Sequence, residues 1–158
     1  MQTEIFFEDF KPGQVFDLGS KTVTREEIIE FASEFDPQPF HLDDEAGKAS
    51  LLGGLSASGW HTGALVMKLL ADGLLSRTSS QGSNSIDKLS WLKPVFPGDT
   101  LSATATVIGT RDLRSRPDIG VVNFEISVRN QSRADVMRQI GPIFFGRRAA
   151  AVPGAENR

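Results

Sequence analysis

Apolar residues recur at helical spacing in the first half of the chain. In residues 25–35 they lie on one helical face, and Thr24 followed three residues later by Glu27 forms a capping box, in which the two residues satisfy free backbone N–H groups at the helix start. Residues 60–75 are apolar on nearly all sides, and Ser58 is well placed as their N-cap. A helix that is apolar all round is usually buried, so the rest of the chain must wrap it.

The second half of the chain alternates apolar and polar residues with a period of two, which is typical of strands with one buried face. Strands are predicted in residues 86–93, 100–110, 120–130 and 135–148, with an earlier strand near residues 15–23. One buried helix followed by a run of antiparallel strands indicates an α+β fold, in which an antiparallel sheet wraps around a single central helix.

Two smaller features of these elements are also predicted. A short helix is predicted in the stretch "LDDEAGKAS", residues 42–50, with Asp43 or Asp44 as its N-cap. Pro142 lies inside the last strand, and because proline has no N–H to donate, it indicates a sheet edge or a bulge there.

Composition narrows the class of protein. The 158 residues are enough for one domain, which we place at residues 1–148, followed by a flexible tail at 149–158. The net charge of −3 gives no indication of a nucleic-acid partner or of an acidic membrane surface. There is no cysteine, no signal or transit peptide and no apolar run long enough to span a membrane, so we expect a cytoplasmic protein.

The stretch "FDPQPFH" carries the strongest candidate chemistry. It contains Asp36 and His41, one of only two histidines, and between them lies a segment with Pro37 and Pro39. The proline rings restrict the backbone and so lower the entropy lost in holding both side chains on one water molecule. Asp36 could also simply end the preceding helix, with His41 a satisfied polar group beneath a loop.

Three segments carry a resemblance to a known family. "DPQPFH" contains Asp36 and His41, "ASGWHT" contains Gly59, and "LKPVFPGDTL" occupies residues 92–101. In this order they resemble the MaoC-like dehydratases of the hotdog-fold superfamily, the group that includes the (R)-specific enoyl-CoA hydratases. Gln38 stands where the family usually has Asn, in a loop that shapes the pocket.

The resemblance implies a hotdog fold and reversible hydration of 2-enoyl thioesters. It implies that Asp36 activates water, that His41 acts as the acid, and that Gly59, with Ser58 and Gln38, contributes to oxyanion and substrate binding. Free backbone N–H groups converge at a helix start, and glycine lets a thioester oxygen approach closely. The resemblance further implies a homodimer formed by edge-to-edge sheet extension. The expected substrate is an acyl-CoA, with an acyl carrier protein as a second carrier, and no metal or redox cofactor is expected.

Other polar residues have two readings. Arg114 and Arg116 lie in a loop between two strands, where they could contact the phosphates of coenzyme A or simply face solvent. His61 is interpreted as a packing residue. A metal site made of Asp36, His41 and His61 is disfavoured because the chain offers no further ligand cluster.

Two rival functions belong to different classes. Thioesterases of the same fold usually carry a carboxylate on the central helix, but here no acid precedes Asp72, near the far end of that helix. A non-catalytic subunit that binds acyl thioesters is the second rival. The intact Asp36 and His41 argue against it, because a degraded site would tolerate the loss of either residue.

Overall fold

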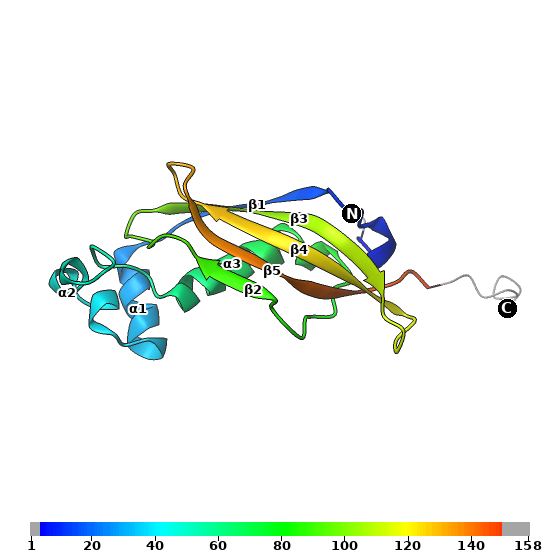
Figure 1. The fold of residues 1–158 in the computed structure, drawn as a ribbon, viewed down its shortest axis with the longest axis horizontal. Coiled ribbons are helices and arrows are strands. Elements are labelled where there is room, and N and C mark those ends of the chain that lie inside the picture. Colours follow the sequence, from blue (N-terminus) through cyan, green and yellow to red (C-terminus); the bar gives the residue numbers. More distant parts are fainter. Residues whose placement is uncertain (1–3, 150–158) are drawn as a thin grey trace, which may run out of the picture.

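A five-stranded antiparallel sheet packs against one long helix in the computed structural model, which describes residues 4–149 (Figure 1). The strand order is β1-β3-β4-β5-β2, so β1 and β2 form the two edges. The strands are β1 (Val15–Thr22), β2 (Lys88–Trp91), β3 (Thr100–Asp112), β4 (Ile119–Arg129) and β5 (Asp135–Gly146). The helices are α1 (Arg25–Phe35), α2 (Asp44–Ala49) and α3 (Gly59–Gly73), with short 3-10 turns at η1 (Phe7–Asp9), η2 (Pro39–His41) and η3 (Leu75–Arg77).

The core lies between α3 and the sheet. Val66 and Leu70 of α3 belong to one buried cluster with Val122 and Phe124 of β4, and each of these side chains is at most 2% exposed. Helix α3 lies behind the sheet in Figure 1, and the sheet curves along it. The predicted α+β hotdog arrangement, an antiparallel sheet around one central helix, is confirmed.

The helices begin where the sequence predicts. Thr24 Oγ1 accepts the N–H of Glu27 and the Glu27 carboxylate accepts the N–H of Thr24, so the capping box is complete. Asp43, rather than Asp44, caps α2 by accepting the N–H of Ala46. Ser58 caps α3 through the N–H of Trp60, and the helix therefore begins at Gly59.

The structure bears out one of the two alternatives predicted for Pro142, a sheet edge, and shows no bulge there. Strand β5 lies between β4 and β2, and the β4–β5 register runs without a shift past Pro142. Proline is accommodated because β2 begins at Lys88, opposite Ile140, and therefore does not extend beside Pro142. Beyond Ile140 the loop before β2 lies beside β5 in place of a strand. Ser83 Oγ donates to the carbonyl of Pro142, and Phe144 N–H donates to the carbonyl of Gly82.

Helices α1 and α2 gather at one end of the molecule, and the turn between β3 and β4 lies at the other end (Figure 1). Within residues 4–149, no helix is long and apolar enough to cross a membrane. The division into a domain at 1–148 and a tail stays a prediction, because residues 150–158 of the tail lie outside the described residues.

Candidate active site

The loop after α1 brings Asp36 and His41 together. Asp36 ends α1, as expected for a residue before proline, and its backbone leaves the helical region. The backbone then turns sharply, because Gln38 N–H donates to the carbonyl of Asp36 and His41 N–H donates to the carbonyl of Gln38. The turn η2 carries His41 back toward the carboxylate, so that the two side chains meet across the loop.

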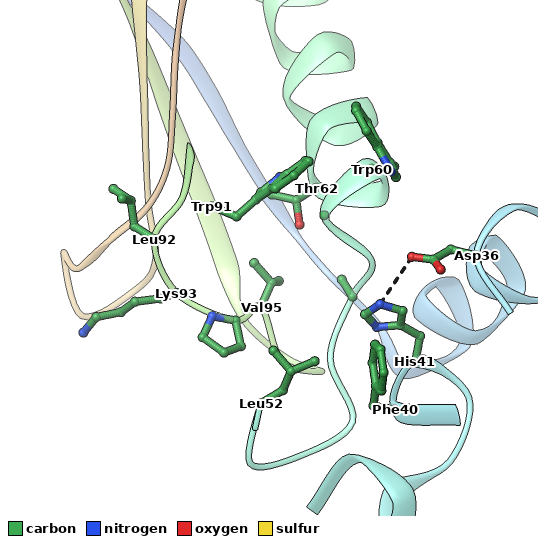
Figure 2. Close-up of a pocket in the computed structure, with 13 residues that line it drawn as sticks. Asp36, Phe40, His41, Leu52, Trp60, Thr62, Trp91, Leu92, Lys93 and Val95 are labelled. Carbon is green, nitrogen blue, oxygen red and sulfur yellow. Dashed lines mark ion pairs between the residues drawn. The ribbon is translucent and has the colours of Figure 1, made fainter. Parts of the chain in front are cut away.

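Both nitrogens of the His41 ring are engaged. Nδ1 lies 2.6 Å from the carbonyl oxygen of Ser56, and because a carbonyl only accepts, Nδ1 must carry the proton. Nε2 then points at Asp36, with Oδ2 3.3 Å away (Figure 2). The ring is buried while the Asp36 side chain keeps 18% of its surface exposed. If Nε2 also carries a proton, it donates a hydrogen bond to the Asp36 carboxylate. If Nε2 carries none, it and Asp36 Oδ2 are two acceptors that face each other.

Asp36 accepts two further hydrogen bonds. Ser58 Oγ donates to Oδ2 at 2.7 Å, and Gln38 Nε2 donates to Oδ1 at 2.6 Å. The bond from Ser58 is the largest cause of a pKa for Asp36 below its usual value, burial opposes it, and Gln38 and the nearby His41 lower the pKa further. Asp36 is therefore ionised at neutral pH and can accept a proton.

An open cavity of about 370 Å³ lies beside this pair. Trp60, Trp91, Leu52 and Val95 give it a mostly apolar wall, and Asp36 and His41 contribute polar atoms to it (Figure 2). A thioester with an apolar acyl chain suits such a lining, because apolar area is removed from water while a few polar groups set the orientation.

Gly59 lies at the start of α3, directly under Trp91. A Cβ at this position would lie 2.6 Å from Cε2 of the Trp91 ring, so only glycine fits without moving the indole. Gly59 N–H is the first donor of the helix, and within the described residues it has no hydrogen-bond acceptor. A free donor at the positive end of a helix, in a cavity wall, can bind an oxygen that gains negative charge.

Of the predicted site residues, Asp36, His41, Ser58 and Gly59 are brought together, and Gln38 bonds to Asp36 without lining the cavity.

Arg114 and Arg116 are not brought to this cavity. They lie in the turn after β3, at the opposite end of the sheet (Figure 1), and Arg116 is paired with Asp118 at 2.8 Å. Their contact with coenzyme A phosphates stays a prediction.

His61, the second histidine, is packed away from the cavity. Its ring stacks on Phe31 with centroids 4.8 Å apart and planes 10° apart, and burial lowers its pKa. Within residues 4–149 no group of three acidic or histidine side chains could hold a metal ion. The expectation of a metal-free site stays a prediction.

Three contributors to the site were missed from the sequence. The Ser56 carbonyl orients His41, Trp91 packs on Gly59, and Lys93 lies at the cavity wall with its side chain directed away from the Asp36–His41 pair (Figure 2). A backbone carbonyl leaves no residue signature, and Trp91 comes from a strand distant in sequence. Only Lys93, adjoining the "PVFPGD" turn, could have been suspected.

Comparison with known proteins adds four findings. A family model described as "MaoC like domain" matches residues 9–129. The chain is 32% identical to Uncharacterized protein YdeM of Bacillus subtilis, covering 82% of this chain and 90% of that one. It is 29% identical to the (R)-specific enoyl-CoA hydratase of Rhodospirillum rubrum, covering 66% and 70%. The crystal structure of a MaoC-like dehydratase from Rhodospirillum rubrum superposes with a TM-score of 0.83 at 41% identity, covering 92% of this chain and 99% of that one.

Proposed function

Because this chain belongs to the MaoC-like domain family, we propose that it catalyses the reversible addition of water to 2-enoyl thioesters. The observation that carries the proposal is the Asp36–His41 contact of 3.3 Å in the wall of an otherwise largely apolar cavity. Hydration of a conjugated double bond needs a base for water, an acid for the α-carbon and a donor for the thioester oxygen. Asp36, His41 and Gly59 supply groups of these three kinds.

The ionised Asp36 is the base and His41 is the acid. Asp36 accepts a proton from water as the hydroxyl bonds to the β-carbon, and protonated His41 gives its Nε2 proton to the α-carbon. The proton on Asp36 then passes to Nε2, because Oδ2 and Nε2 face each other at 3.3 Å. One water is consumed and both side chains return to their starting forms. Ser56 holds the ring through Nδ1 during the cycle, so the ring exchanges protons only at Nε2.

Gly59 N–H is the proposed oxyanion donor. As electrons move from the β-carbon toward the carbonyl, the thioester oxygen gains negative charge, and a donor fixed at a helix start stabilises it without reorganising. The carrier is proposed to be coenzyme A, with acyl carrier protein as the other carrier, and no cofactor beyond the substrate is invoked.

A homodimer is proposed through the β2 edge of the sheet. Strand β2 has a partner on one side only, and Trp91, Leu92 and Ile86 in and beside it are each more than 40% exposed. An unpaired, apolar strand edge favours pairing with another strand. Light scattering at micromolar concentration should give twice the chain mass, and a mass equal to one chain would contradict the dimer.

The test of the function follows the ultraviolet absorbance of the conjugated double bond in crotonyl-CoA and longer 2-enoyl-CoAs, with a thiol reagent in parallel. We expect absorbance to fall without release of thiol. Release of free thiol would instead indicate a thioesterase, and a thermal shift with coenzyme A without either change would indicate a binding subunit. The thioesterase receives no support from Asp72, the acid of α3, which is exposed and paired with Lys68.

A further inference from the structure

Two more cavities lie along α3, next to the cavity that holds Asp36 and His41 (the catalytic cavity). The first, of about 190 Å³, shares Trp60 with the catalytic cavity, and the second has about 230 Å³. Both are mostly apolar, and they have five lining residues in common: Met67, Leu70, Ile86, Ile126 and Gln139. An acyl chain whose thioester lies at Gly59 would extend along this channel, so what lines it decides which chains bind.

Gln139 is the polar member of the five shared residues. It lies on the face of β5 that meets α3, because it pairs with Ile126 of β4, a core residue 2% exposed, and with Leu89 of β2. Its neighbour Arg138 points to the other face, where it binds Glu125. Gln139 is half-buried, and its amide forms no hydrogen bond with any residue that the structure describes.

The serines of the channel differ from Gln139 in this respect. Ser83 Oγ donates to the carbonyls of Ser85 and Pro142, and Ser80 Oγ accepts the N–H of Gly82. These hydroxyls already have partners in their own loop and in β5. The Gln139 amide alone among the shared lining residues brings free donor and acceptor atoms to an apolar channel.

We propose that Gln139 selects substrates whose acyl chain carries an oxygen atom beyond the reacting double bond; the proposal rests on the proposed hydration of enoyl thioesters. An alkyl chain that fills the channel removes water from the amide and leaves its polar atoms unpaired. A chain with an ether, hydroxyl or carbonyl oxygen accepts from the amide and avoids this cost. Leaving a buried amide unpaired corresponds to roughly a 5- to 100-fold loss in binding or rate.

The oxygen belongs several bonds from the thioester. Trp91, which lines the catalytic cavity, pairs with Met137, and Gln139 is two residues further along β5. Two residues of a strand span roughly 7 Å. A four-carbon chain is too short to test the amide, and an eight-carbon chain is the suitable length.

The test compares 2-octenoyl-CoA with analogues in which an ether oxygen replaces one methylene at successive positions of the chain. For the wild type, we expect kcat/KM to be about 5- to 100-fold higher for the best analogue than for the alkyl chain. Gln139→Met, which keeps a long unbranched side chain, should remove this preference. Gln139→Leu is the second variant if the first fails to fold. Met67→Leu changes the same channel without removing a polar atom and should keep the preference.

Equal preference in wild type and Gln139→Met, or an alkyl chain favoured at every position, would overturn the proposal. If no 2-enoyl-CoA is hydrated, the proposed function fails separately. In that case the binding affinities of the saturated alkyl and ether acyl-CoAs, which bind without reacting, are compared by titration calorimetry. A preference lost in Gln139→Met would support the role of Gln139, and identical affinities would overturn it.

Discussion

Two buried histidines lie near the start of α3, and each has a carboxylate near it. His41 donates from Nδ1 to the Ser56 carbonyl, faces Asp36 with Nε2 and lines the cavity. His61 stacks on Phe31, has the charge of Glu27 nearby, and its Nδ1 has no hydrogen-bond partner in the described structure. The residue type and the burial are nearly the same in the two places, so neither explains why one forms a site.

The difference lies in what the second nitrogen meets. His41 shares a carboxylate with Ser58, beside a space where a substrate fits, while His61 is enclosed by aromatic packing. Burial lowers the pKa of His61 and thereby favours the neutral ring. The proposed mechanism needs a histidine whose free nitrogen faces both a proton partner and a cavity, and of the two histidines only His41 has this geometry.

The largest effect is expected for Asp36→Asn. This change removes the carboxylate that faces His41 Nε2, and losing a general base lowers kcat/KM by roughly 10²- to 10⁴-fold. The assay is the absorbance of crotonyl-CoA. Asp72→Asn is the matched control, because Asp72 is an exposed carboxylate on α3, away from the cavity. Equal activity in wild type and Asp36→Asn would remove Asp36 from the mechanism.

A smaller loss is expected for Gly59→Ala. The new methyl group would displace the Trp91 ring and crowd the N–H proposed to bind the thioester oxygen, and misplacement of this kind lowers kcat/KM by roughly 10- to 100-fold. In Gly109→Ala, the control on β3, the added Cβ has no atom within 4 Å. If both alanine variants keep wild-type kcat/KM, the start of α3 is not the oxyanion site.

Ser58→Ala should shift the pH dependence rather than abolish activity. The Ser58 bond lowers the pKa of Asp36, so its removal raises that pKa. Because Asp36 must be ionised, activity that falls as pH falls should be lost at a higher pH in the variant. Thr24→Ala removes a comparable helix cap, worth about 1 kcal/mol of stability, without touching Asp36. A pH profile of kcat/KM that moves equally in both variants would indicate a stability effect alone.

Much of the fold could be predicted because its signals are local. The Thr24–Glu27 capping box and the Ser58 cap each lie within four residues, and the two periodicities identify the buried helix and the strands. For Pro142 the sequence leaves a sheet edge and a bulge open, because what decides between them is not local. The edge beside Pro142 depends on where β2 begins, and β2 lies more than 50 residues earlier in the sequence.

The candidate site, like the fold, combines local features that the sequence predicts with long-range contacts that it does not. That Asp36 and His41 lie close together could be predicted because they share one short loop, and that Ser58 and Gly59 lie together because they start one helix. The bond from Ser58 to Asp36 spans 22 residues and the carbonyl that orients His41 lies 15 residues away, so neither contact has a local pattern. Arg114 and Arg116 were placed in the right kind of segment, but β3 runs away from the cavity and carries them to the other end.

The assignment of the chemistry to the Asp36–His41 pair is tested by comparing His41→Gln with His61→Gln in the hydration of crotonyl-CoA, with thermal unfolding of both variants. We expect His41→Gln to lose roughly 10²- to 10⁴-fold in kcat/KM while remaining folded, and His61→Gln to stay within about 3-fold of wild type. A folded His41→Gln with wild-type kcat/KM, or an equal loss in a folded His61→Gln, would contradict the assignment of the chemistry to the Asp36–His41 pair.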